Sequence, residues 1–458
     1  MTTISRFLAL SAAALVAGRA ASPASLAAQT PTTPHDTMLT LGQAARLAAR
    51  QSAAVLAARE RSREAAARVT QARSALLPDL SANASRTGRT FNTATFGIDF
   101  PAPPGQPPLF DPNGQVEGPV NLWDVRGRVA ANLLDLGALG RVRAAQSAQR
   151  ATGAEAENQG DLAATQAASA YLRALRAEGQ YRARAADSAL ALDLLGIAQE
   201  QLRAGTGVAL DVTRAQSQIA QSQAALITAR ADRDRAQLDL RRALNLSLDT
   251  PIRLADSLGT LPANESLPNE TDAVQRALAN RPDLRAAAAQ VEAARRQTSA
   301  IKAERLPTVS AFVDQGNIGK DLNHMLPTYD YGVQVSLPIF DGFRREGRVE
   351  EQQAVANEAE LRRRDLEAQA AVEVRGALLD LRAAREQVAA TAERVRLAEQ
   401  ELSQARERFR AGVAGNADVI TASLSLNAAR TASVDALTAY QTARVSLARA
   451  QGSLTELP

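Results

Sequence analysis

Apolar side chains recur at every seventh position over residues 374–412. A bulky series occupies one position of the repeat, and a series of mostly small residues lies three positions further on. The two series are Val374, Leu381, Val388, Val395, Leu402 and Phe409, and Ala377, Ala384, Thr391, Ala398, Ala405 and Gly412. This a/d heptad pattern predicts a long helix in a left-handed supercoil, with small d residues that let a neighbouring helix approach closely.

The pattern returns after a short break at Gly412, a residue that can form the left-handed cap of a helix. A second helix is expected from Asp418 onward. Its a positions are Val419, Leu426, Ser433, Tyr440 and Leu447, and its d positions are Ala422, Ala429, Ala436, Ala443 and Ala450. The two helices predict a long hairpin that packs along its sides.

The chain contains a second copy of this hairpin, shifted by 207 positions towards the N-terminus. Residues 202–205 correspond to 409–412, and Asp211 corresponds to Asp418. The returning helix repeats the pattern at Val212, Ile219, Leu226 and Leu240, with Arg233 as the one break, and at Ala215, Ser222, Ala229, Ala236 and Ala243. Shorter helical segments, 39–77 and 273–306, repeat with a shift of 229. Two copies of one unit predict a duplicated architecture.

Between the helical segments the pattern becomes strict alternation, which predicts β-strands. The apolar series are Trp123, Val125, Gly127, Val129, Ala131 and Leu133, and Tyr329, Tyr331, Val333, Val335, Leu337 and Ile339. Their length and aromatic residues are typical of membrane-spanning strands, with weaker partner strands around 80–84 and 309–313 and loops at 91–120 and 316–328. The alternative is a soluble hairpin with one buried face. Because four strands cannot close a membrane barrel, the membrane interpretation requires an oligomer.

The long helices are expected to begin after Asp135-Leu136-Gly137 and Asp341-Gly342-Phe343, where the aspartate can cap the helix N-terminus or complement its charge. These patterns divide the chain into an expected signal peptide (1–27), a polar leader (28–38), a first repeat (39–245), a linker (246–269), a second repeat (270–452) and a tail (453–458). The signal peptide rests on Arg6 followed by an apolar run and small residues. Such a signal peptide is expected to direct the chain to an envelope compartment.

The amino-acid composition limits the kinds of functional site that the chain can form. The 458 residues include no cysteine and two histidines, and the net charge is only +4 because arginines are interleaved with acids. A solvated helix face explains these charges better than a nucleic-acid partner does. No catalytic triad, metal-ligand cluster or phosphate-binding glycine loop is present in the sequence, so neither a cofactor nor an enzymatic activity is expected.

Four segments resemble one family. The run from Ser336 to Arg345 resembles the strand-to-helix signature of outer-membrane efflux proteins, the TolC-like outer-membrane factors. Residues 203–212 and 410–419 resemble the hairpin tips of that family, and residues 273–284 resemble the opening of its repeat. The resemblance covers essentially the whole mature chain in both halves.

This resemblance implies a homotrimer in the outer membrane. Three chains would form a twelve-stranded barrel in contact with outer-membrane lipid, continuous with a long helical tunnel through the periplasm. It also implies a periplasmic adaptor and an inner-membrane transporter as partners, and a passive exit duct for efflux or type I secretion as function. The alternative is a periplasmic coiled-coil scaffold or adaptor that forms no channel. Drugs, metal ions and secreted proteins all remain open as cargo.

The resemblance also implies roles at the tips. Asp211 and Asp418 match aspartates that line a periplasmic constriction, where a ring of carboxylates favours cations; the alternative is that both only sit favourably at a helix N-terminus. Thr421 stands at a second acidic position of the family pattern, and Phe409 and Ala414 stand where a tyrosine and an arginine can tie the tip closed. The turns expected to dock the adaptor, whose glycines also serve as helix caps, comprise Arg203, Gly205, Gly207, Val208, Arg410, Gly412, Val413 and Gly415.

Overall fold

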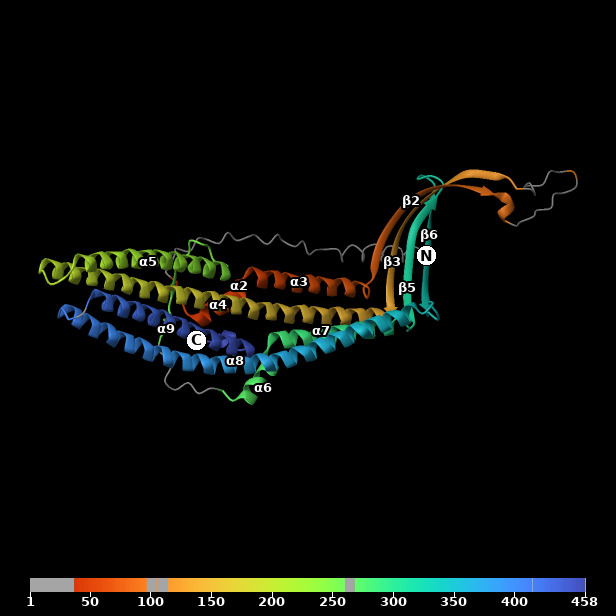
Figure 1. Cartoon of the computed structure of the whole chain (residues 1–458). Helices are drawn as coiled ribbons and strands as arrows, with labels where there is room; N and C mark the ends of the chain where they lie inside the picture. The colour runs from red at the N-terminus through yellow and green to blue at the C-terminus, as the bar shows by residue number, and fades with distance from the viewer. Residues whose placement is uncertain (1–36, 97–104, 106–113, 260–267, 414, 458) are drawn as a thin grey trace.

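A computed structural model describes residues 37–96, 105, 114–259, 268–413 and 415–457. The expected signal peptide, most of the polar leader and Ala414 lie outside the described residues. Long helices run side by side through most of the length of the molecule, and a β-sheet stands at one end (Figure 1). The turns of both long hairpins lie at the opposite end from the sheet.

β1 (Thr37–Leu39) lies where the leader meets the first repeat. The first repeat then contains two shorter helices, two strands and a long hairpin: α2 (Leu41–Gln51), α3 (Ala53–Ser74), β2 (Asp79–Asn92), the short η1 (Thr93–Phe96), β3 (Val116–Leu134), α4 (Leu136–Arg203) and α5 (Ala209–Ala243). The single helix predicted for 39–77 is wrong, because Ser52 adopts an extended conformation between α2 and α3 and its hydroxyl accepts a hydrogen bond from the backbone N–H of Val55. Serine is a favourable cap for a new helix.

The linker contains β4 (Ile252–Leu254). The second repeat then follows the order of the first, with α6 (Glu270–Asn280), α7 (Pro282–Ala303), β5 (Thr308–Gly319), β6 (Met325–Ser336), α8 (Arg344–Arg410) and α9 (Asn416–Ala450), and η2 (Leu454–Glu456) lies in the tail. The helix predicted for 273–306 is also interrupted, at Arg281, which is 229 positions after Ser52. Pro282 is the first residue of α7, where its missing N–H costs no helical hydrogen bond.

Two short strands join the repeats partway along the helical body, beside Tyr171 and residues 252–258. This region is called the waist below. β1 pairs in parallel with β4, so the expected leader and linker both contribute backbone to a small sheet that the sequence did not predict. Beside it, the hydroxyl of Tyr171 lies 2.8 Å from the carbonyl oxygen of Leu39 and 2.9 Å from a carboxylate oxygen of Asp256. Burial raises the pKa of Tyr171, so this phenol remains a neutral hydrogen-bonding group.

The larger sheet has four antiparallel strands in the order β2-β3-β5-β6. Its strands are longer than predicted, so the loops expected at 91–120 and 316–328 are wrong in extent: β2 runs to Asn92, and β5 and β6 are separated only by residues 320–324. Leu337 and Ile339 lie beyond β6, which ends at Ser336 before Pro338. Residues 337–341 have no regular secondary structure and lead into α8. The expected helix cap from Asp341 is wrong, because Phe343 itself is the N-cap residue and makes no side-chain capping bond; Asp341 lies 3.3 Å from Arg345 instead.

The predicted heptad seam, meaning the row of a and d positions along which the helices pack, is confirmed in the second hairpin. All a positions of α8 and α9 are buried except Val395 and Ser433, which are half-buried, and every d position of α9 is buried. α9 packs against both α8 and α4, whereas α5 packs chiefly on α4. The seam of α5 is accordingly more open, with Val212, Ile219 and Leu226 only half-buried.

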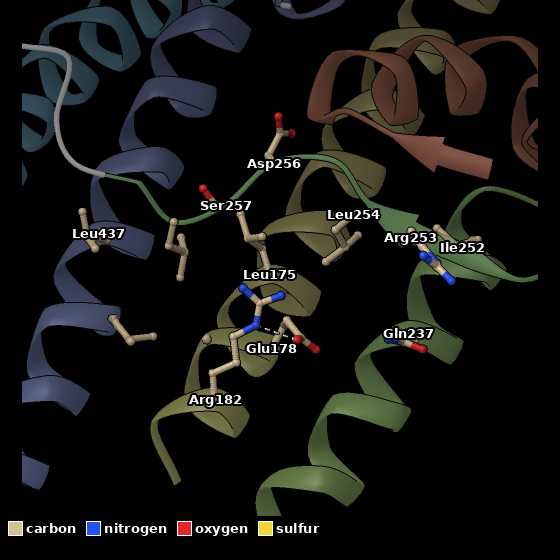
Figure 2. A pocket seen from close by; sticks show the side chains of 13 residues that line it. Leu175, Glu178, Arg182, Gln237, Ile252, Arg253, Leu254, Asp256, Ser257 and Leu437 are labelled. Atoms are coloured by element: carbon tan, nitrogen blue, oxygen red, sulfur yellow. Dashed lines mark hydrogen bonds and ion pairs between the residues drawn. The ribbon is translucent and has the colours of Figure 1, made fainter. Parts of the chain in front are cut away.

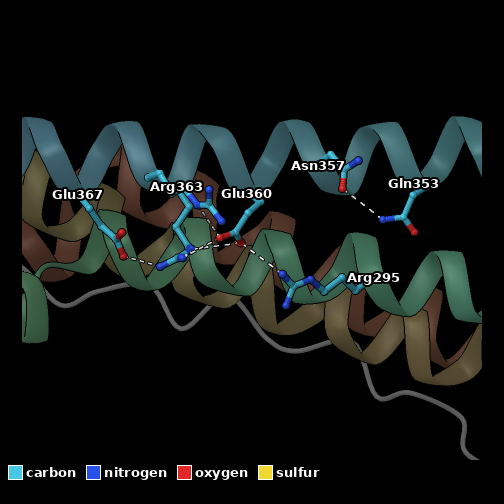
Figure 3. A network of polar contacts seen from close by, with 7 residues as sticks. Arg295, Gln353, Asn357, Glu360, Arg363 and Glu367 are labelled. Carbon is cyan, nitrogen blue, oxygen red and sulfur yellow. Dashed lines mark hydrogen bonds and ion pairs between the residues drawn. The ribbon is translucent and has the colours of Figure 1, made fainter.

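Charged side chains of α8 extend toward α7 and form a network between the two helices (Figure 3). Glu360 of α8 binds Arg363 at 2.8 Å and reaches Arg295 of α7 at 3.4 Å. The Arg363 guanidinium holds the pKa of Glu360 below its usual range. The interleaved charges thus pair along and between helices, as the sequence predicted for a solvated face.

A cavity of about 400 Å³ lies at the waist between α4, α5, α9 and residues 252–258 (Figure 2). On its α4 wall Arg182 donates to Glu178 at 2.9 Å, so these two charges neutralise each other. Gln237 of α5 and Leu437 of α9 face the same space. Among the described helices, none has a segment both long and apolar enough to cross a membrane.

Candidate functional site

The two hairpin turns have the same backbone design. α4 ends at Arg203 and α8 ends at Arg410, and in each turn the second residue after the helix is a glycine with a left-handed backbone: Gly205 (φ 77°) and Gly412 (φ 71°). In each turn, backbone amides just beyond the glycine donate hydrogen bonds back to the last turn of the helix. For example, the amide of Val413 donates to the carbonyl oxygen of Arg408 at 3.0 Å. Glycine is favoured here because the conformation carries no steric cost for it.

The other residues of the turns are held to different degrees. A Cβ on Gly207 would lie 2.9 Å from the Cβ of Gln201, whereas a Cβ on Gly415 would meet no atom within 4 Å. Gly207 is therefore required by close packing and Gly415 is not. Val208 and Val413 present exposed side chains, as do the arginines Arg203 and Arg410.

The two aspartates predicted at the constriction occupy equivalent helix positions but unlike surroundings. Each is the third residue of its helix, Asp211 in α5 and Asp418 in α9. Asp211 is half-buried and lies 3.7 Å from the guanidinium of Arg214. Asp418 is exposed, and no ion pair joins it to another residue in the described part of the chain. Of the two aspartates, Asp418 therefore has the carboxylate that is more accessible to solvent.

The remaining constriction candidates are not grouped around these carboxylates. The ring of Phe409 is only 2% exposed and packs in the core of the tip with Val419 and Leu426. The hydroxyl of Thr421 donates to the carbonyl oxygen of Ala417, one turn earlier in its own helix, at 2.9 Å. Ala414 lies outside the described residues. Phe409 and Thr421 therefore place no charged group beside the two carboxylates.

Two amide side chains that the sequence did not point to connect the hairpin tips. The side-chain nitrogen of Asn416 donates to the carbonyl oxygen of Asp211 at 2.9 Å, and that of Gln201 donates to the carbonyl oxygen of Phe409 at 2.7 Å. Asn416 is fully buried. Each bond joins residues more than 200 positions apart, so no local pattern could reveal it.

Further from the tips the hairpins are joined by polar contacts. Arg176 of α4 binds Asp435 of α9 at 2.8 Å, and Arg184 binds the hydroxyl of Thr431 at 3.1 Å. Asp187 of α4 is buried, and burial raises its pKa although Arg184 and Arg430 act in the opposite direction. These polar contacts add to the apolar cluster that α4 and α9 share nearer the tips.

At the other end of the molecule the large sheet is amphipathic. One register row crosses all four strands through Leu80, Val129, Val313 and Tyr331. The side chains predicted for membrane strands lie in exposed rows of this kind. Val125, Val129, Tyr329, Tyr331, Val333 and Val335 are all exposed, and Trp123 is half-buried under the guanidinium of Arg86. This exposed apolar face needs an apolar environment or a partner.

The opposite face of the sheet carries charge. The neighbouring row contains Ser81, Arg128, Asp314 and Asp330, and Arg128 lies 3.6 Å from Asp314. One residue pair further along, Arg126 binds Asp124 at 2.6 Å. An apolar and a charged face on one sheet match a wall between lipid and water.

Neither a grouping of metal-binding side chains nor a catalytic constellation marks the described residues. Groups of three or more His, Asp or Glu side chains that could hold a metal ion do not occur among them. The described residues instead present exposed charged side chains at the tips and an amphipathic sheet at the other end.

Comparison with known proteins places this geometry in context. A profile of the family described as outer membrane efflux protein matches residues 44–246 and 273–453. Over 159 residues the chain is 30% identical to the solvent efflux pump outer membrane protein SrpC of Pseudomonas putida, covering 33% of this chain and 32% of that protein. The alignment thus spans about a third of the length of the curated relatives that the chain matches.

Solved structures match nearly the whole described fold. The outer membrane protein VceC of Vibrio cholerae has a TM-score of 0.69 at 21% identity, covering 90% of this chain and 96% of that one. The outer membrane channel CmeC of Campylobacter jejuni has a TM-score of 0.73 at 18% identity, covering 90% and 86%. These similarities confirm the predicted TolC-like fold.

Proposed function

Because the chain belongs to the outer membrane efflux protein family, we propose that it is the outer-membrane exit duct of a multi-component export system. It conducts cargo passively, and its long helices extend from the outer membrane into the periplasm. α4 alone has 68 residues, about 100 Å at 1.5 Å per residue, which is far more than a bilayer requires.

The observation that carries this proposal is the large sheet, which has an exposed apolar face, a charged face and two free edges. β2 and β6 each pair on one side only among the described strands. Four strands are too few to enclose a passage, and unpaired edges seek further strands. Three copies of the chain, pairing β6 of one with β2 of the next, supply twelve strands and satisfy both edges.

At the far end, the hairpin tips form the periplasmic opening and the docking surface for an adaptor that links the duct to an inner-membrane transporter. Asp418 supplies a ring of three carboxylates that favours cations. The bonds from Asn416 and Gln201 hold the two tips of each chain together, in place of the tyrosine and arginine positions that Phe409 and Ala414 occupy. Selection of cargo belongs to the transporter.

The proposal is tested by the mass of the purified full-length protein in detergent together with its conductance in a planar bilayer. The expected result is a mass of three chains and stepwise conductance. Asp418→Asn should lower the preference for cations, whereas Asp211→Asn, which removes a charge already paired with Arg214, should lower it less.

The outcomes separate the rival functions. If the protein is a conducting trimer whose ion preference does not change with Asp418→Asn, the result supports the duct and contradicts the carboxylate ring. A water-soluble protein that does not conduct or enter bilayers overturns the duct and favours the periplasmic scaffold.

A further inference from the structure

The two strand pairs of the large sheet are duplicated copies with the same internal register. β5 corresponds to β2 with the shift of 229 positions that also relates the preceding helices, and β6 corresponds to β3 with a shift of 206 that aligns their alternating apolar series. In the second pair, Thr308 lies opposite Ser336. The residues at the equivalent positions of the first pair, Asp79 and Ala130, also lie opposite each other. The two shifts therefore relate contacts in one part of the sheet to equivalent contacts in another.

The contact between β3 and β5 joins the two strand pairs within one chain, and it provides the template for a contact between chains. In a ring of three chains, β6 of one chain meets β2 of the next, and these strands are the equivalents of β3 and β5. A barrel closes only when the stagger between its strands is consistent around the ring, so we expect the same register at both kinds of junction. Within the chain, Asp124 pairs with Ile318. The equivalent pair between chains is Asp330 and Arg89.

Asp330 and Arg89 have opposite charges and lie on the same face of the sheet. Asp330 belongs to the charged row described above, and Arg89 lies an even number of residues after Ser81 along β2, so its side chain is on that face as well. Both residues are exposed in the single chain, and no ion pair joins either of them to another described residue. The Arg89 guanidinium lies 5.1 Å from the centroid of the Phe91 ring. Opposite charges directly across two antiparallel strands stabilise the pairing.

A second pair of residues on the other face of the sheet supports the same register. The shifts place Tyr331 of β6, which is 72% exposed, directly opposite Gly88 in β2 of the next chain. The sheet already contains such a pair, because Phe312 lies opposite Gly332, and a Cβ on this glycine would be only 3.0 Å from the phenylalanine ring. An aromatic ring that covers a glycine across two strands helps to fix their register.

A change of register removes both contacts. A slip of one residue turns the apolar row of one strand to the charged face of the other. A slip of two residues keeps the faces but sets Arg89 opposite Thr328 or Gly332, neither of which carries a charge. It also moves Tyr331 away from Gly88. Among these registers, the one given by the internal duplication alone satisfies both pairs.

From these observations, and resting on the proposed trimeric duct, we infer that Asp330 of one chain and Arg89 of a second copy form an ion pair across the junction between chains. The pair fixes the register of β6 on β2, and three such pairs lie on the charged face of the closed sheet. At the equivalent junction within the chain, Ile318 stands in place of the cation. The ion pair is thus a device of the junction between chains, where the polypeptide itself does not hold the strands in register.

The register can be tested by disulfide cross-linking, because the chain has no cysteine of its own. The full-length variant Arg89→Cys/Asp330→Cys is purified in detergent, oxidised with copper phenanthroline and separated by electrophoresis without reductant. Directly opposed residues have Cα atoms about 5 Å apart, within the range of a disulfide, whereas diagonal neighbours are about 7–8 Å apart. The slipped controls are Thr87→Cys/Asp330→Cys and Phe91→Cys/Asp330→Cys. We expect at least fivefold more covalent dimer and trimer from the 89/330 variant than from either control.

The ion pair is tested separately by exchanging the charges. Asp330→Arg and Arg89→Asp each set two like charges opposite each other, and each should at least halve the fraction of trimer that survives mild heating in detergent. The double variant Asp330→Arg/Arg89→Asp restores opposite charges and should recover most of the trimer. A double variant no better than the single variants would overturn the ion pair.

A pair within the chain separates failure of the register from failure of the proposed function. Asp124→Cys/Ile318→Cys should form a disulfide inside one chain without any dimer, which shows that the oxidation works on this sheet. If a slipped control forms more dimer than the 89/330 variant, the chains still meet edge to edge, so the duct stands and the inferred register is overturned. If only the pair within the chain reacts, the register is also overturned, and the mass in detergent then decides the proposed function. Three chains retain the duct, and a single chain removes it.

Discussion

The two long hairpins share one sequence pattern and differ in how the molecule uses it. In the second hairpin, α9 lies between α8 and α4, and nearly all its heptad positions are buried. In the first hairpin, α5 packs chiefly on α4, its seam is half-open, and Ile227 and Leu238 remain exposed on its surface. The heptad pattern therefore specifies which two helices pair within a hairpin. The additional packing of α9 on α4 depends on how the two hairpins are arranged.

The hairpin tips also differ between the two repeats. The tip contacts come from Asn416, whose counterpart 207 positions earlier is Ala209, and from Gln201, whose counterpart is Arg408. Each bond is thus made by a residue that the other repeat lacks. At these two bonds, the interface between the halves depends on positions where the halves have diverged.

The largest effect is expected where the hairpins are alike. Leu240 and Leu447 are equivalent positions near the waist, and both are buried (1% and 7% exposed). Leu240→Ala and Leu447→Ala should each cost about 3 kcal/mol, because each removes a buried side chain and leaves a cavity. Thermal unfolding followed by helical circular dichroism should show equal losses, and a large inequality would show that the comparison fails even at the waist.

A matched pair of valines tests where the hairpins differ. Val419 is fully buried in α9, and its equivalent Val212 is half-buried in α5. Val419→Ala should cost about 2 kcal/mol and Val212→Ala less than half of that, since apolar burial scales the loss. Equal shifts of the melting temperature would mean that another copy of the chain covers α5 in the assembly.

The tip amides provide a functional contrast. Asn416→Ala and Gln201→Ala each remove a bond between the tips, worth about 1 kcal/mol, and should raise the open fraction of single channels about fivefold. Thr421→Ala, which removes only a bond within one helix turn, is the control and should leave gating unchanged. Unaltered gating in both amide variants would contradict a closing role for these contacts.

The glycines of the two turns should respond unequally. Gly207→Ala forces its Cβ against Gln201 and should cost about 1 kcal/mol or more, whereas Gly415→Ala enters open space and should cost less. Hydrogen exchange at the last turns of α4 and α8 measures the local loosening. Equal exchange in the two variants would show that the Gly207 turn relaxes without penalty.

The smallest effect concerns Asp187, whose counterpart in the second repeat is the exposed Arg394. Since burial raises the pKa of Asp187 in the folded chain, the folded state binds its proton more tightly than the unfolded state. Acidification from pH 7 through that raised pKa should therefore stabilise the wild type relative to Asp187→Asn. Melting temperatures of both proteins across this range provide the measurement, and parallel pH profiles would contradict it.

The sequence predicted what depends on local periodicity. The seams of the hairpins, the glycine caps at Gly205 and Gly412, and the alternating faces of β3 and β6 all follow from residues a few positions apart. The strands β1 and β4 were missed because three-residue segments have no measurable period and owe their conformation to each other. The bonds of Asn416 and Gln201 were missed because they depend on how two hairpins meet.

The sheet order has a consequence for how the chain folds. Trp123 of β3 pairs with Gly319 of β5, and the helices α4, α5, α6 and α7 lie between them in the chain. Closing so long a loop costs chain entropy that few contacts can repay early in folding. The helices α4 to α7 must therefore dock first and carry the two strand pairs together. The joining of β3 to β5 is then a late event in folding, and the apolar face that reaches lipid is completed only after the helical body has taken shape.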